Sequence, residues 1–171
     1  MRRRLQRIRR HLHWWTAALV AVGFAIAWLM TALPATELLV KFLLYQIHKS
    51  LGLCVAGLAG LRVVLAWRAG DPPRGVPAAL YLLLLVVPLL GYLTAAASPT
   101  AVPTLFFLVL RVPHAIAPDQ AVFDVFRPVH KWLAIGLIAL AAWHAARVAG
   151  WVRRRVARSG HAHPSAEPKR R

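Results

Sequence analysis

Four long apolar runs, nearly free of charge, constrain this chain more than any other feature of its sequence. They cover residues 12–33, 46–67, 78–97 and 129–152. A helix needs ~20 predominantly apolar residues to cross the hydrocarbon core of a membrane. Backbone groups in lipid must also be paired, which only helices and closed barrels achieve. The sequence therefore predicts an all-α membrane protein, a bundle of four transmembrane helices.

The composition excludes the main alternatives. Of 171 residues, 59% are hydrophobic, and Lys and Arg number 22 against 5 Asp and Glu, for a formal net charge of +17. Such hydrophobicity excludes a disordered basic chain, and the apolar runs are too long for the core of a soluble nucleic-acid-binding domain. The single cysteine, Cys54, excludes an intrachain disulfide, a multi-cysteine cluster and a C-x-x-C-H haem attachment.

The segments around the runs suggest three parts: a basic N-terminus at 1–11, the four-helix domain at 12–156 and a basic tail at 157–171. We expect the tail to be disordered. The connection at 34–45 is short, whereas 98–128 is long and contains TLFFLVLRV. That apolar piece is too short to span, so we expect it to lie on or dip into the membrane interface. The Arg-rich start resembles a signal peptide, but the first run exceeds the usual ~7–15 residues, which favours a retained helix.

Basic residues gather at alternate ends of the runs. Six Arg precede the first run, two lie between the second and third, and seven Lys or Arg follow the fourth. In the other two connections, acidic residues offset the few basic ones. The positive-inside rule then predicts a multi-pass membrane protein with both termini and the connection at 68–77 in the cytoplasm.

Four histidines fall within the predicted spans: His13, His48, His130 and His144. An ionisable group at membrane depth indicates function, although a lone imidazole also serves as hydrogen-bonding glue between helices. With the predicted orientation, His13 and His144 lie near the inner face, and His48 and His130 near the outer face. The spacing of His130 and His144, 14 residues (144 − 130), is close to four turns, so both share one helix face.

Two imidazoles at each depth favour haem over other metals. Zinc takes four ligands, and di-iron bundles need inward Glu side chains, whereas both Glu residues lie outside the spans. Haem iron accepts two axial ligands from the protein. We predict two non-covalent, bis-histidine haems b, the inner iron held by His13 and His144 and the outer iron by His48 and His130. Polar glue between helices remains the alternative.

Arg62 and Gly52 are further candidates for haem binding. Arg62 lies 14 residues (62 − 48) after His48, on the same helix face and at the inner depth. Because Arg matches a carboxylate bidentately, we predict that it binds a propionate of the inner haem; snorkelling to the interface is the alternative. Gly52, one turn after His48, is predicted to leave room for the porphyrin, with ordinary helix packing as the alternative. That choice stays undecided for Gly57, Gly60 and Gly91.

These motifs resemble the bacterial cytochrome b561 family over residues 8–155. His-Trp opens the first run, IHKSLG the second, YLLLLVVPLLG fills the third, and two histidines stand at the family spacing in the fourth. The resemblance implies a di-haem bundle that exchanges electrons with quinone or a partner redox protein. It also implies that His13, His48, His130 and His144 are axial ligands and that Arg62 contacts a propionate.

The expected function is electron transfer in or across the inner membrane, between a quinone pool and another redox protein of the periplasm or membrane. Bound ubiquinone, superoxide:quinone oxidoreductase activity and a homodimer are left open. Two alternatives also stand: the cytochrome b subunit of a larger, hydrogenase-type oxidoreductase, and a non-redox scaffold or small transporter. Membrane lipid is the expected surrounding, and no nucleic acid partner is expected because the basic residues orient the helices.

Overall fold

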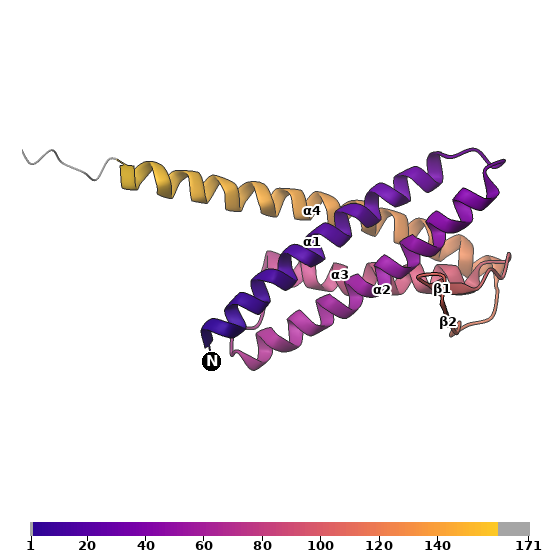
Figure 1. Cartoon of the computed structure of the whole chain (residues 1–171), viewed down its shortest axis with the longest axis horizontal. Coiled ribbons are helices and arrows are strands. Elements are labelled where there is room, and N and C mark those ends of the chain that lie inside the picture. Colours follow the sequence, from indigo (N-terminus) through magenta and orange to yellow (C-terminus); the bar gives the residue numbers. More distant parts are fainter. Residues whose placement is uncertain (1, 161–171) are drawn as a thin grey trace, which may run out of the picture. The chain divides into compact units, whose positions relative to one another are not determined.

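The computed structural model describes residues 2–160 and is mainly helical (Figure 1). Its elements are α1 (Arg2–Ala32), α2 (Leu38–Arg68), α3 (Val76–Ala97), β1 (Thr104–Phe106), β2 (Leu110–Val112) and α4 (Gln120–Gly160). Within the described residues, four helices are long and apolar enough to cross a membrane. The predicted fold class, a membrane bundle of four helices, is confirmed.

The chain divides into two compact units, Met1–Leu137 and Ile138–Arg171. The first unit holds α1 to α3, the hairpin and the start of α4; the described part of the second is the remainder of α4. Of the four candidate histidines, only His144 lies in the second unit.

The core of the first unit lies between α2, α3 and the start of α4. Val55 and Ala59 of α2 pack with Leu84 and Val87 of α3 and with Leu137 of α4. Many other large apolar side chains on the helices are exposed. Because soluble monomers rarely expose wide apolar surfaces, this distribution agrees with helices whose outer faces contact lipid.

The second helix begins earlier than predicted. α2 starts at Leu38 rather than at Gln46, so most of the expected connection at 34–45 is helical. The Lys41 side chain donates a hydrogen bond of 2.9 Å to the carbonyl oxygen of Leu33, at the end of α1. A basic group at this place satisfies a carbonyl that the helix leaves unpaired, which favours the tight connection.

The fourth helix also begins earlier and ends later than predicted. α4 starts at Gln120 instead of the predicted residue 129, so it contains Pro128, which falls in the predicted connection at 98–128. Asp119 caps it, because its Oδ1 accepts a 3.0 Å hydrogen bond from the amide of Val122. α4 includes residues 157–160, the first four residues of the predicted tail. The rest of the tail, 161–171, lies outside the described residues.

The apolar piece TLFFLVLRV forms a β-hairpin, a structure that the sequence did not predict. β1 and β2 are antiparallel, with Thr104 opposite Val112 and Phe106 opposite Leu110. The turn between them places Phe107 at φ 46° and Leu108 at φ 65°. Bulky residues rarely adopt this left-handed region, which costs about 1–3 kcal/mol for each residue. Contacts outside the hairpin must therefore hold it.

Two buried polar residues of α2 hold the hairpin on the bundle. The Gln46 side chain is fully buried; it donates to the carbonyl of Pro103 at 2.8 Å and accepts from the amide of Leu105 at 2.9 Å. One turn later, the Ser50 hydroxyl oxygen accepts from the amide of Phe107 at 2.8 Å. The helix thus provides side-chain partners for strand backbone groups that would otherwise be buried unpaired.

Candidate functional site

His48 and His130 lie together in the first unit. His48 comes from α2 and His130 from α4, and their ring centroids are 6.3 Å apart with an interplanar angle of 82°. His48 Nδ1 lies 3.0 Å from the carbonyl oxygen of Gly23 in α1, and His130 Nδ1 lies 2.9 Å from that of Val87 in α3. A carbonyl oxygen only accepts, so each Nδ1 donates its proton, and in the neutral ring Nε2 keeps the lone pair.

This arrangement fits the binding of one metal ion by two imidazoles. A metal-bound imidazole nitrogen lies ~2 Å from the ion, which places two such ring centroids about 6 Å apart. The observed 6.3 Å agrees with that separation. Metal-bound histidines almost always donate their second nitrogen to a carbonyl, a carboxylate or water, as both rings do here. We refer to His48 and His130 as the hairpin-end site.

Two protein ligands suit haem iron better than a metal bound by protein alone. Over residues 2–160, no group of three or more His, Cys, Asp or Glu side chains could hold a metal ion. Haem iron takes its four equatorial nitrogens from the porphyrin and needs two axial ligands. The donor set of the hairpin-end site therefore matches that of a bis-histidine haem.

Gly91 of α3 makes room for His130. A Cβ atom added to Gly91 would lie 2.8 Å from Cε1 and 3.2 Å from Nδ1 of the His130 ring. Carbon atoms do not approach so closely, so any side chain here would displace the ring. At Gly52, an added Cβ would lie 3.9 Å from the Cβ of Pro88, an ordinary contact between α2 and α3. The porphyrin-accommodating role of Gly52 stays a prediction.

His13 and Arg62 meet at the opposite end of α2 from the hairpin. Arg62 Nη2 lies 3.1 Å from His13 Nδ1, and the guanidinium carbon stands 4.8 Å above the ring of Tyr81 in α3. Arginine only donates, so Nδ1 of His13 is the acceptor in this bond. The part-buried Arg62 side chain thus contacts α1 and α3. We refer to His13, Arg62 and Tyr81 as the basic-end site.

His144 is described by itself because it belongs to the second unit. It lies on α4 one residue after Trp143, whose ring carries the Arg147 guanidinium at 4.9 Å. The pairing of His13 with His144 stays a prediction.

Several residues near the two sites were missed from the sequence. Gln46 and Ser50 flank His48 and hold the hairpin; their signal was a pair of polar residues one turn apart in an apolar run. Tyr81 stacks on Arg62. Tyr92, next to Gly91, donates a 2.7 Å hydrogen bond to the carbonyl of Pro113, beyond the hairpin. No sequence pattern indicated the partners of these two tyrosines.

The fold and the site define a class, the four-helix membrane proteins that bring a pair of imidazoles together, as b-type cytochromes do. The family described as prokaryotic cytochrome b561 matches residues 4–159. The chain is also 30% identical over 148 residues to cytochrome b561 homolog 2 of Escherichia coli (strain K12), covering 77% of this chain and 76% of that protein. The chain belongs to the prokaryotic cytochrome b561 family. It is therefore a membrane b-type cytochrome of electron transfer.

Proposed function

We propose that this cytochrome carries two haems b and transfers electrons across the bacterial inner membrane, between a quinone pool and a second redox protein. The hairpin-end haem is held by His48 and His130, and the other by His13 and His144, with Arg62 on a propionate of the latter. The observation that carries the proposal is the close approach of the His48 and His130 rings, 6.3 Å between centroids.

The residues of the hairpin-end site favour electron transfer over oxygen chemistry. Bound haem supplies one-electron chemistry at its iron. If His48 and His130 both bound the iron of a haem here, they would leave it no open position for a small ligand. The carbonyls of Gly23 and Val87 accept the Nδ1 protons, which fixes the ring orientations and would make the imidazoles stronger donors to an iron.

The distribution of charge supports an orientation with the basic end in the cytoplasm. Arg9 of α1 pairs with Asp71, in the connection after α2, at 3.1 Å. That connection and the start of α1 therefore lie on the same side, where the basic residues gather. The hairpin end then faces the periplasm, and the two haems lie at different depths of the membrane.

The test is a count of haems by reduced spectra. The full chain, purified in detergent, is expected to show a b-type spectrum with two haems per chain after dithionite, and reduction by quinol. His130→Ala is expected to lose one haem and keep the other. His11→Ala is the matched control, because the exposed His11 lies on the same helix as His13 but outside both proposed pairs.

Each part of the proposal fails separately. One haem per wild-type chain refutes the di-haem assignment. Two haems in His130→Ala refute the pairing with His48. A spectrum that responds to dithionite but not to quinol removes quinol as the donor and leaves the haem assignment intact.

A further inference from the structure

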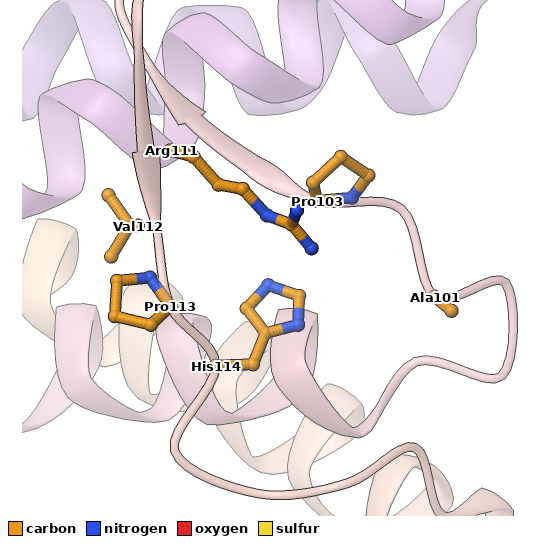
Figure 2. A pocket seen from close by; sticks show the side chains of 6 residues that line it. All are labelled: Ala101, Pro103, Arg111, Val112, Pro113 and His114. Carbon is orange, nitrogen blue, oxygen red and sulfur yellow. The ribbon is translucent and has the colours of Figure 1, made fainter.

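A pocket beside the hairpin lies outside both candidate haem sites. Its volume is about 330 Å³, and its lining residues are Ala101, Pro103, Arg111, Val112, Pro113 and His114. Figure 2 shows the guanidinium of Arg111 and the imidazole of His114 close together, on the side of the pocket that Pro103 and Ala101 border. The pocket thus combines two nitrogen-rich side chains with apolar walls, a usual composition for a small-ligand site.

Two basic side chains line this pocket, and a third, Lys49, lies near enough to act on His114 electrostatically. The pKa of His114 is lowered, first by burial and then by the positive charges of Lys49 and Arg111. Among the side chains that the structure describes, residues 6–157, no carboxylate forms an ion pair with Arg111. An anion bound here would relieve the repulsion between these cations.

One hydrogen bond and one aromatic contact hold the ring of His114 at the pocket. Thr104 Oγ1 lies 3.1 Å from His114 Nε2, and the Tyr92 ring stands edge-on at 6.4 Å between centroids. When the Thr104 hydroxyl donates to Nε2, Nδ1 carries the proton and is available as a donor. Arg111 and His114 can then donate to two oxygens of the same anion, a geometry that suits phosphate.

The turn of the hairpin presents apolar side chains next to this basic pocket. Phe107, Leu108, Val109 and Leu110 are 47%, 44%, 88% and 64% exposed, and Arg111 follows directly. Two of these residues, Phe107 and Leu108, hold positive φ angles, a conformation that persists only where the surroundings impose it. In a membrane protein, an apolar tip beside a basic pocket corresponds to the acyl chain and phosphate of one lipid.

We propose that the pocket of Arg111 and His114 binds the phosphate of an anionic phospholipid headgroup, whose acyl chains lie against the exposed turn 107–110. The lipid would fasten the hairpin to the membrane. Gln46 and Ser50 tie the hairpin to the helix that carries His48, so the same contact braces the hairpin-end site.

The test compares lipid retention by purified full-length protein in native mass spectrometry. The probes are phosphatidylglycerol, phosphatidylcholine and inorganic phosphate. We expect phosphatidylglycerol to bind best, and Arg111→Gln to weaken it about tenfold because a charge-assisted hydrogen bond is lost. Arg127→Gln is the matched control, since Arg127 stacks on Phe123 of its own helix and does not line the pocket. Equal retention by both variants overturns the proposal.

A second variant separates lipid from free phosphate without risk to folding. Val109→Ser alters an 88% exposed side chain at the tip of the turn. It is expected to weaken phosphatidylglycerol retention and to leave inorganic phosphate binding unchanged. If inorganic phosphate binds wild-type protein as tightly as the lipid does, or if Val109→Ser has no effect on the lipid, the site is not a lipid site.

Discussion

The hairpin-end and basic-end sites use the same side chain in opposite ways. At the hairpin end, His48 and His130 donate their Nδ1 protons to carbonyl oxygens of neighbouring helices. At the basic end, His13 Nδ1 accepts a hydrogen bond from Arg62. The partner of Nδ1 decides which nitrogen of a neutral imidazole is left with a lone pair. Nε2 therefore has a free lone pair in His48 and His130, whereas in a neutral His13 it carries the proton.

The hairpin-end imidazoles have the protonation that binding of a metal through Nε2 would require. For His13 to bind iron through Nε2, its proton would instead lie on Nδ1, and Arg62 would donate to another acceptor. A haem propionate, the partner proposed for Arg62, would be such an acceptor.

The largest expected effect comes from filling the space at Gly91. Gly91→Val should displace the His130 ring, since even a Cβ would lie 2.8 Å from its Cε1. We expect the loss of the hairpin-end haem and retention of the other, measured as haem per chain from reduced spectra. The control is Gly57→Val, because no atom lies within 4 Å of a Cβ at Gly57. Two haems in the Gly91 variant would show that this close approach does not matter for binding.

The sequence predicted the helices, and it predicted His48 and His130 at one depth, because both predictions depend on local regularities. Apolar runs of membrane length must be helical, and helical periodicity places residues 14 apart, such as His48 and Arg62, on one face. The approach of His48 to His130 followed from their predicted depth. Their separation of 6.3 Å and the contact of Arg62 with His13 then came from the structure.

The remaining features depend on contacts between distant segments. The role of Gly91 arises from the close approach of α3 to His130 of α4. The spacing of residues within one helix cannot reveal such an approach. A nine-residue apolar piece suits an interfacial segment as well as a hairpin; here Gln46 and Ser50 decide for the hairpin by pairing with its backbone. Similarly, Pro128 is a poor helix residue locally, yet α4 passes through it.

A smaller effect is expected from the charge at the basic end. Arg62→Gln removes a cation near the proposed inner haem and should lower its midpoint potential by roughly 50 mV, as a charge about 15 Å away at an effective dielectric constant near 20 would. The hairpin-end potential should change less. Redox titration followed at the haem bands measures both, with Arg68→Gln, at the exposed end of α2, as control. A fall in the midpoint potential of the hairpin-end haem alone would refute the assignment of Arg62 to the inner haem.

The third effect concerns the support of the hairpin-end site. Gln46→Leu leaves the carbonyl of Pro103 and the amide of Leu105 without their side-chain partner. A buried unpaired group costs about 1–3 kcal/mol, so the apparent melting temperature should fall and the Leu105 amide should exchange faster. Thr31→Ala is the control, because the Thr31 hydroxyl bonds only to carbonyls of its own helix. An unchanged exchange rate at Leu105 would mean that Gln46 does not hold the hairpin.

The smallest effect is a pH dependence confined to the hairpin end. The pKa of His114 lies below its ordinary value because of burial, Lys49 and Arg111, so the folded chain binds this proton less readily than the unfolded chain. The free energy of unfolding should therefore fall as the pH drops below the ordinary histidine value, and level off below the lowered pKa. Between about pH 7.5 and about pH 5, wild type should lose more thermal stability than His114→Gln, and His11→Gln should behave as wild type. Equal losses in all three proteins would assign the proton to another group. A loss of thermal stability restricted to chains that keep His114 would show that protonation of His114, beside Lys49 and Arg111, destabilises the folded chain. An anion bound beside Arg111 would reduce this destabilisation, because it would offset the positive charge.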